Sequence, residues 1–218
     1  MDSFIAKFPA LPDGDLALCE EHGVAYQRDM NADRVQYGAG YLSKIAAYDR
    51  DIAEAVNNGR CALLARHCAA GATVLDVGAG DGTFVRCARS WGFCAFGFEV
   101  IPEAALALLA DDLFKDAPEL FDAVTLWDCL EHLEEPGLRL RGIRDGAKVF
   151  VSMPIFEDLR KIRESKHYRP GEHLTYWTAN GFINWMTAYG FRLLEQSDHE
   201  VQAGRDSIGA FAFCRERT

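Results

Sequence analysis

The sequence predicts an α/β protein with a doubly wound, mostly parallel sheet of seven strands, or of six strands if the third is missing. Two observations support this fold class. From Thr73 onward, short apolar runs typical of strands alternate with stretches of helical periodicity, as in βαβ units. The last two apolar runs are joined directly through residues 198–206, which predicts an antiparallel hairpin at the C-terminal edge of the sheet.

The composition is that of a folded globular chain. Its 218 residues are 49% hydrophobic and 26% charged, which provides enough apolar material for a core and excludes wholesale disorder. No apolar run approaches the ~18 residues that a membrane span needs, and the first residues lack the features of a secretory signal. Seven cysteines without a C-x-x-C pair indicate reduced thiols. We therefore expect a soluble protein of the cytoplasm.

The first seventy residues differ from the rest, and we expect residues 1–70 to form a helical N-terminal extension that caps the domain. Turn formers and scattered tyrosines in residues 1–40 predict irregular or loosely helical structure. Apolar spacing predicts a helix from Tyr41 to about Val56. The run Asn57-Asn58-Gly59 is expected to interrupt this helix, and a second short helix to end at Gly71.

Residues 71–218 are expected to form the main domain, with residues 154–178 inserted as a lid. The predicted strands are Thr73–Val77, Ala95–Glu99, Ala123–Trp127, Lys148–Met153, Phe191–Gln196 and Ile208–Cys214. The predicted helices are Phe84–Trp91, Pro102–Leu109, Pro136–Ile143 and Ala179–Tyr189.

A glycine-rich turn follows the first of these strands, in the run VLDVGAGDGTF from Val74 to Phe84. Glycines at 78 and 80 allow a positive φ and a close approach of the backbone to a ligand. The run is G-x-G-x-G, whereas a dinucleotide fingerprint is G-x-G-x-x-G. Asp76 and Asp81 would repel a pyrophosphate, so the loop suits a cationic ligand without phosphate.

Two further carboxylates stand at the ends of predicted strands. Glu99 ends the second strand, where an acidic residue can accept hydrogen bonds from both ribose hydroxyls. Asp128 ends a third, in the run FDAVTLWDCLEHLEEP that begins at Phe121. Ligands of open α/β sheets bind at the carboxyl ends of the strands, which is where all these groups are expected to lie.

These three segments resemble those of the class I S-adenosylmethionine-dependent methyltransferases. The sequence around Asp128 is similar to that of the small-molecule-type subgroup, which includes ubiquinone-biosynthesis O-methyltransferases. The likeness runs from about Ala70 to Cys214. It implies S-adenosylmethionine as cofactor, S-adenosylhomocysteine as product, and a methyl transfer to oxygen or nitrogen of a small-molecule acceptor, which could be anionic.

The resemblance also implies the site residues. Glu99 would hold the ribose, with Phe98 and Val100 beside the adenine, and Trp127 and Asp128 would lie near the sulfonium and the acceptor. The residues implied around the methionine end are Asp76, Gly78, Ala79, Gly80, Asp81 and Phe84. The family usually has a third strand followed by an acidic residue at the adenine amine; here only Asp111-Asp112-Leu113-Phe114 fills that space, and Asp112 is the candidate.

Three residues are the catalytic candidates: His173, His132 and Asp128. His173 lies in a run H-L-x-x-[FW] that borders the active site in the resembling subgroup, and an imidazole can take a proton from a hydroxyl or amine near neutral pH. Relatives of the ubiquinone type carry a similar acidic-x-x-Glu-His run that can hold a divalent cation. The spacing of Asp128, Glu131 and His132, at i, i+3 and i+4, predicts that they share one helical face that could bind Mg²⁺, Mn²⁺ or Zn²⁺. We favour a structural role for Glu131 and His132 and predict no metal ligands.

The predicted lid contains a concentration of basic residues between Arg160 and Arg169. Two interpretations stay open. These residues could recruit an acceptor bearing carboxylate or phosphate, or they could form a solvated surface.

Other functions fit less well. The 23 basic and 33 acidic side chains give a net charge of −10, which disfavours nucleic acid, although the basic insertion keeps a tRNA substrate as an alternative. A protein that binds S-adenosylmethionine without transferring methyl groups is a second alternative. The third glycine of the dinucleotide fingerprint is absent from its usual position. This absence, together with Asp76 and Asp81, argues against an NAD-dependent oxidoreductase.

Overall fold

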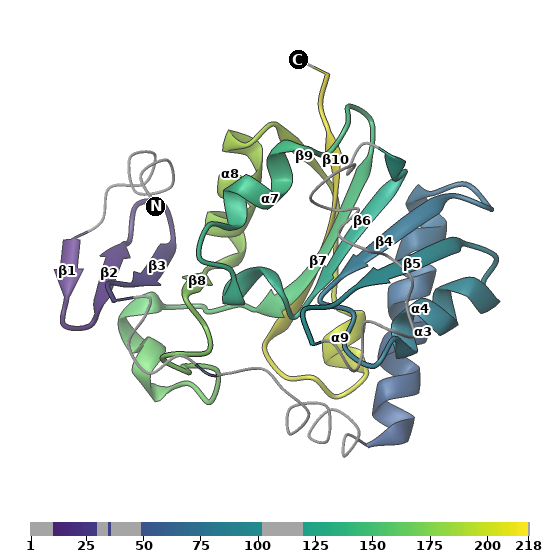
Figure 1. Cartoon of the computed structure of the whole chain (residues 1–218). Helices are drawn as coiled ribbons and strands as arrows, with labels where there is room; N and C mark the ends of the chain where they lie inside the picture. The colour runs from purple at the N-terminus through teal and green to yellow at the C-terminus, as the bar shows by residue number, and fades with distance from the viewer. Residues whose placement is uncertain (1–10, 30–34, 36–48, 102–119, 218) are drawn as a thin grey trace.

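A computed structural model describes residues 11–29, 35, 49–101 and 120–217 and contains two sheets (Figure 1). The main sheet has strand order β5-β4-β6-β7-β10-β9. Its strands are β4 (Thr73–Val77), β5 (Cys94–Phe98), β6 (Ala123–Trp127), β7 (Lys148–Pro154), β9 (Phe191–Ser197) and β10 (Ile208–Arg215).

The pairing within the main sheet confirms the predicted fold class. Strands β5, β4, β6 and β7 are parallel, and β10 runs antiparallel to both β7 and β9. The six strands begin and end close to the predicted positions, and the predicted hairpin is β9 with β10. The region expected to hold a third strand, including Asp112, lies outside the described residues.

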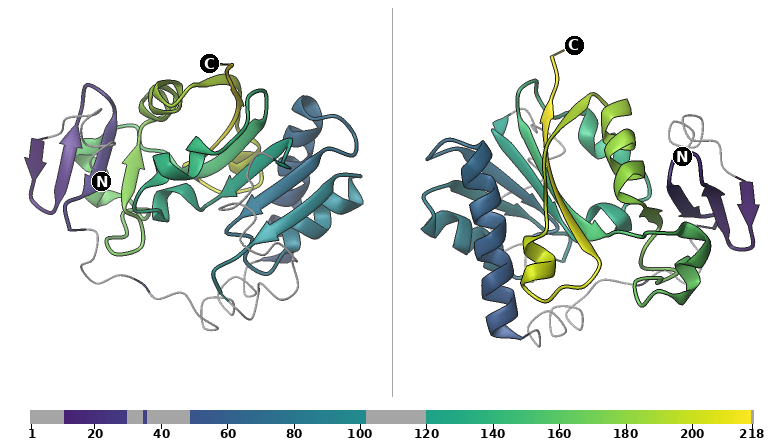
Figure 2. Two further views of the ribbon diagram at one scale, coloured as in Figure 1. Left: turned by 45° about the horizontal axis from the view of Figure 1, so that its top comes forward. Right: turned by 180° about the vertical axis from the view of Figure 1, so that it is seen from behind.

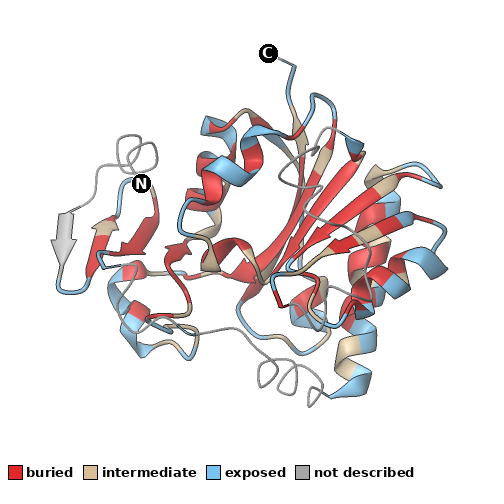
Figure 3. Ribbon diagram, in the orientation of Figure 1, coloured by how far each residue is buried: buried red, intermediate tan, exposed pale blue. Residues whose placement is uncertain are grey.

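Helices cover both faces of the main sheet (Figure 2). On one face, α3 (Arg50–His67) and α4 (Thr83–Ser90) pack against alternate residues such as Val74. On the other, α7 (Pro136–Arg141) and α8 (Ala179–Ala188) pack against the intervening residues such as Leu75. The central strands are therefore buried along most of their length (Figure 3), as parallel sheets require.

Three short helices complete the described elements. The 3-10 helices η2 (Leu130–His132) and η3 (Leu159–Glu164) follow β6 and β7 respectively. Helix α9 (His199–Gln202) lies between β9 and β10, where the sequence predicted a direct connection. None of the helices in the described ranges combines the length and apolar character that crossing a bilayer would need.

The helical prediction for the start of the N-terminal extension is wrong, because residues 11–27 form strands. The chain forms β1 (Leu11–Asp13), β2 (Leu16–Cys19) and β3 (Val24–Gln27), which are joined as an antiparallel meander. Turns at Gly14 and Gly23, both with positive φ, connect them. The fourth strand of this second sheet is β8 (Thr175–Trp177), from the predicted lid.

Contacts distant in sequence explain why the extension becomes a sheet. Residues from both segments share one small core, which contains Leu16 and Ala25 from the extension and Leu159, Ile162 and Tyr176 from the lid. Neither segment could bury these side chains alone. The extension and the insertion therefore form one unit beside the main sheet (Figure 1).

The predicted interruption at residues 57–59 is also wrong, because α3 runs unbroken from Arg50 to His67. Its N-terminus is capped by Asp49, whose carboxylate accepts hydrogen bonds from the backbone amides of Asp51 and Ile52. The glycine serves packing: a Cβ at Gly59 would lie 2.6 Å from Cδ2 of His199. Gly59 thus lets α9 approach the helix closely.

We expect Gly181→Ala to lower the free energy of unfolding by about 1–3 kcal/mol. A Cβ at Gly181 would lie 2.1 Å from the carbonyl oxygen of Gly23, so the N-terminal sheet must move away from α8. This cost exceeds the roughly 1 kcal/mol that alanine usually contributes to a helix. Urea denaturation measures the difference, with the exposed neighbour Asn180→Ala as control. A Gly181→Ala protein as stable as the parent would contradict this packing.

Candidate active site

The glycine-rich loop connects β4 to α4 at the carboxyl edge of the main sheet. Gly78, Gly80 and Gly82 have φ values of 76°, 54° and 74°, a region that non-glycine residues rarely adopt. The amides of Gly78 and Ala79 both donate to the carbonyl oxygen of Phe98, over 2.9 and 3.0 Å. The loop is thereby closed against the end of β5.

Glu99 follows β5 directly and holds the same loop. Its Oε2 accepts a hydrogen bond of 2.8 Å from the amide of Gly80, and its Oε1 accepts from the amides of Val100 and Ile101. A carboxylate has about four lone-pair sites, so capacity for hydroxyl donors is left. Glu99 is half-buried, whereas Val100 is 68% exposed.

The two aspartates of the loop region have different environments. Asp76 is buried within β4 and accepts a 2.6 Å hydrogen bond from the hydroxyl of Thr125. Burial raises the pKa of Asp76 to about 7. Asp81 is exposed and accepts a hydrogen bond from the amide of Thr83, the first residue of α4. Asp76 is therefore held inside the sheet, whereas Asp81 lies at the surface of the loop.

Aromatic side chains pack beside the loop, at the end of β6 and in the first turn of α4. Phe84 and Trp127 are buried and meet edge to face, with ring centroids 5.4 Å apart. The guanidinium of Arg60, on α3, lies 4.8 Å from the centroid of Trp127. Phe98, at the end of β5, is half-buried. Three of the predicted cofactor residues, Phe84, Trp127 and Phe98, are thus part of the core or packed directly against it.

Asp128 has a left-handed backbone conformation, with φ 51°, immediately after β6. The amide of Asp128 donates to the carbonyl oxygen of Ser152 on β7, which fixes the turn. The 3-10 helix η2 then follows. The chain therefore turns sharply at Asp128, in contrast to the single helical face that we expected for Asp128, Glu131 and His132.

The carboxylate of Asp128 belongs to a buried cluster of four charges that the sequence did not reveal. Arg205 donates to both oxygens of Asp128, over 2.8 and 2.9 Å, and to Glu200 over 2.6 Å. Arg60 donates to Asp128, to Glu200 and to the hydroxyl of Ser152. Glu200 has 0% exposure and Asp128 is one-third exposed, so the two guanidinium groups compensate one fully buried and one partly buried carboxylate.

The four-charge cluster (Arg60, Asp128, Glu200 and Arg205) keeps Asp128 ionised. Although partial burial of the carboxyl opposes this, the positive charges of Arg205 and Arg60 lower the pKa of Asp128 to about 2. Its members come from α3, the end of β6, α9 and the loop before β10. No motif marks such a set, because the four residues are brought together by tertiary structure.

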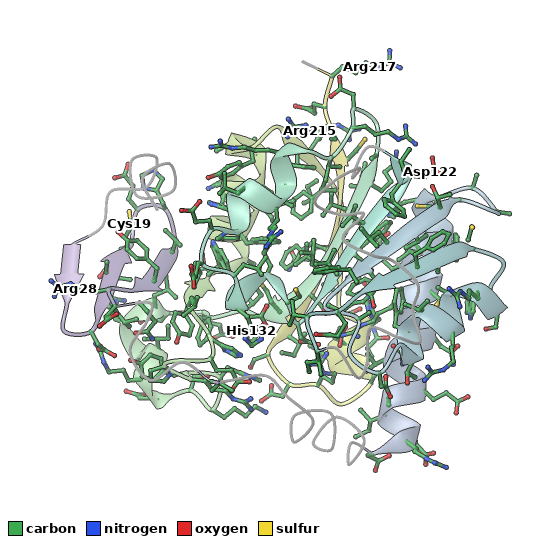
Figure 4. All side chains as sticks on the ribbon, viewed as in Figure 1. Cys19, Arg28, Asp122, His132, Arg215 and Arg217 are labelled. Atoms are coloured by element: carbon green, nitrogen blue, oxygen red, sulfur yellow. The ribbon has the colours of Figure 1, made fainter. Side chains whose placement is uncertain are left out.

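A second cluster, Glu131, His132 and His173, lies beside the first and joins the main sheet to β8. One possible ligand atom from each residue lies within 4.8 Å of the others. The rings of His132 and His173 meet edge to face at 4.8 Å. Figure 4 labels His132 here, at the edge opposite Asp122, which precedes β6.

Both imidazoles in this cluster use Nδ1 as the hydrogen-bond donor, so that Nε2 keeps its lone pair. Nδ1 of His132 lies 2.8 Å from the carbonyl oxygen of Glu172, and Nδ1 of His173 lies 2.9 Å from that of His167. A carbonyl can only accept, so each Nδ1 carries the proton and each Nε2 is a lone-pair donor. Burial lowers the pKa of His132, and burial with the neighbouring His132 lowers that of His173 to about 3, which keeps both rings neutral.

Glu131 completes a donor set that fits a divalent cation. Its side chain is 2% exposed, and Oε2 has no hydrogen-bond partner among the described residues. Burial, and then the charge of Asp128, raise its pKa well above the usual range. One carboxylate and two neutral imidazoles are ligands that suit Zn²⁺ or Mn²⁺ and leave positions open for water or substrate. This donor set differs from the structural role that we predicted for Glu131 and His132 from the sequence.

Four of the basic residues of the insertion are engaged within the protein. Exposed ion pairs join Arg160 to Asp158, Arg163 to Asp15, Lys166 to Asp206, and Arg169 to Glu172. Of the two interpretations left open, this arrangement favours a solvated surface over a site that recruits an anionic acceptor.

Comparisons with known proteins agree with this geometry. Residues 48–196 match the model of a family described as a methyltransferase domain. No curated protein sequence matches the chain significantly. The structure is similar to magnesium protoporphyrin IX methyltransferase from Synechocystis PCC 6803, with a TM-score of 0.56 and 18% identity over 81% of this chain and 94% of that one.

Two further solved structures share the fold. The 1,6-didemethyltoxoflavin-N1-methyltransferase of Burkholderia thailandensis has a TM-score of 0.56 and 17% identity, covering 95% of this chain and 98% of the other. A mitomycin 7-O-methyltransferase has a TM-score of 0.55 and 14% identity, covering 80% of this chain and 60% of the other.

We expect Arg205→Met to cost about 3–5 kcal/mol of stability, because it leaves two carboxylates facing Arg60 alone in a buried setting. Arg160→Met, which breaks the exposed pair with Asp158, is the control and should cost less than about 1 kcal/mol. Both values come from chemical denaturation. Similar small effects for the two variants would show that the four-charge cluster contributes little.

We expect Zn²⁺ or Mn²⁺ to bind with a stoichiometry near one and to raise the melting temperature, reversibly with chelator. His173→Gln should weaken this binding by about tenfold or more, since it removes one of three ligands. His67→Gln is the control, because His67 pairs with Glu195 elsewhere. Calorimetric titration measures both. Equal cation affinity in the parent and in His173→Gln would rule out the second cluster as the binding site.

Proposed function

Because the chain belongs to the methyltransferase domain family, and is therefore an enzyme, we propose that it transfers the methyl group of S-adenosylmethionine to an oxygen or nitrogen atom of a small-molecule acceptor. The glycine-rich loop held by Glu99 is the observation that carries this proposal. The Synechocystis and Burkholderia enzymes were both crystallised with S-adenosylhomocysteine, which supports the same donor here.

The donor would lie across the carboxyl ends of β4, β5 and β6. Glu99 offers its remaining lone pairs to the ribose hydroxyls, with Phe98 and Val100 beside the adenine. The methionine part lies along the loop from Gly78 to Asp81. Asp76 has a pKa of about 7, and a cationic group that binds nearby would stabilise its ionised carboxylate. A carboxylate at this position therefore suits a loop that binds a cationic ligand and not a phosphate.

The acceptor would approach from the side of His132 and His173, between the main sheet and the second sheet. Methyl transfer is an in-line displacement, so the protein's main contributions are to align the nucleophile with the C–S bond and to exclude water. Orientation of this kind supplies about 7–11 kcal/mol. Nε2 of each histidine can accept a hydrogen bond from a hydroxyl or amine of the acceptor and so orient it, whereas the lowered pKa values make both rings poor proton acceptors.

Asp128 has a different role in this proposal from that of a base. Both its oxygens are engaged by Arg205 and Arg60, and its pKa is low, so it is a poor proton acceptor. Its carboxylate positions the turn between β6 and η2, from which Glu131 and His132 project. A divalent cation on Glu131, His132 and His173 would act as a Lewis acid on an acceptor oxygen.

A small molecule is a better acceptor class than nucleic acid. The net charge is −10, and four basic residues of the insertion (Arg160, Arg163, Lys166 and Arg169) are paired with acidic ones. The toxoflavin and mitomycin enzymes, by their names, methylate a nitrogen and an oxygen of small molecules, which supports both kinds of acceptor atom here.

We expect Glu99→Gln to weaken the binding of S-adenosylmethionine by about 10-fold to 100-fold, because it removes charge-assisted hydrogen bonds worth about 1.5–3 kcal/mol each. Calorimetric titration with S-adenosylhomocysteine measures the affinity, and exposed Glu157→Gln is the control. Transfer of labelled methyl groups is then followed on a panel of phenols, carboxylic acids and amines, with tRNA alongside. No binding by the parent protein, or labelling of tRNA alone, would refute the proposal.

A further inference from the structure

Two cysteine thiols lie in contact between α3 and α4, and neither belongs to the cluster of Glu131, His132 and His173. The thiol of Cys61 donates to Sγ of Cys87 over 3.4 Å, and the thiol of Cys87 lies 3.8 Å from Oδ1 of Asn58. Cys87 thus lies against two successive turns of α3. All seven cysteines fall within the described residues, and each is a free thiol.

We propose that Cys61 and Cys87 form a site of oxidative modification, at which hydrogen peroxide converts the two thiols into a disulfide that joins α3 to α4. A disulfide has an S–S distance of about 2.05 Å, so the two sulfur atoms must approach by about 1.3 Å. Side-chain rotation and a small shift between the helices can provide this, because the sulfur atoms already face each other.

The two thiols have distinct roles in the reaction. Cys87 is partly exposed and reacts first: its sulfur attacks peroxide, gives a sulfenic acid and releases one water molecule. Cys61 has 0% exposure, and burial raises its pKa, so it is protected from direct attack. Cys61 then displaces hydroxide from the sulfenic acid, and the second water leaves. The two thiols together lose two protons and two electrons, and peroxide is reduced to two molecules of water.

The location of the pair connects this modification to the active site. Cys61 follows Arg60, a member of the four-charge cluster, and α4 begins directly after the glycine-rich loop. A Cys61–Cys87 bond closes a loop of chain that contains β4 and the whole glycine-rich turn. The bond would restrain the two helices that cover this half of the sheet, and a dithiol reductant would reverse it.

The experiment uses the full chain, reduced, exposed to hydrogen peroxide and then alkylated. Trypsin cleaves after Arg60 and Arg86, which gives peptides 61–66 and 87–89 with one cysteine each. We expect these two peptides linked, with a mass lower by two hydrogens than their sum. We also expect the melting temperature to rise by about 5 °C, slower amide hydrogen exchange in α3, and reversal of both by dithiothreitol.

Two variants keep the test decisive. Cys87→Ser should abolish the linked peptide and the rise in melting temperature, whereas exposed Cys94→Ser should preserve both. Recovery of Cys61 and Cys87 as separate alkylated peptides, at a peroxide dose that oxidises Cys94, would overturn the proposal. So would an equal rise in melting temperature in Cys87→Ser. Loss of methyl transfer in any of these proteins bears on the proposed function and not on the disulfide.

Discussion

The carboxyl ends of parallel strands must lie together, and the rest of this site depends on that constraint. Because β5, β4 and β6 are paired in parallel register, the residues after them meet at one edge although they are far apart in sequence. The backbone amides after β4 then find acceptors at the end of β5, namely the carbonyl of Phe98 and the carboxylate of Glu99. The glycine-rich loop is therefore shaped by its neighbour strand as much as by its own glycines.

Burial of charge is the second organising feature of the site. Two guanidinium groups and two carboxylates share one cluster, in which Glu200 is fully buried and Asp128 is one-third exposed. A single unpaired charge in that place would be costly, whereas the paired set lets α3 and the β9–β10 connection be fixed against β6. Asp128 thereby holds the turn that precedes Glu131 and His132, and its negative charge helps to raise the pKa of the neighbouring Glu131.

The second sheet shows how an insertion can be supported by a distant segment. The loop that carries His173 would have few contacts of its own, but β8 after it is paired with β3. A chain of hydrogen bonds runs from the side-chain amide (Nε2) of Gln27 to the hydroxyl of Tyr176, and from there to the backbone carbonyl of His173. The N-terminal extension therefore stabilises the side of the site opposite the glycine-rich loop. Arg160 and Arg163 of η3 form exposed ion pairs on this unit.

The sequence by itself determined the strands of the main sheet, the glycine-rich loop and the acidic residues at the strand ends, because apolar periodicity and glycine conformations are local properties. It misjudged residues 11–27 and 57–59, where distant partners decide the outcome: the core shared with Tyr176 makes the first segment a sheet, and the close approach of His199 explains a glycine inside α3. Only the tertiary structure brought Arg60, Glu200 and Arg205 to Asp128, and His173 to Glu131. Buried charges and neutral donors pair because they are close in three dimensions. The spacing of these residues along the sequence does not predict which of them meet.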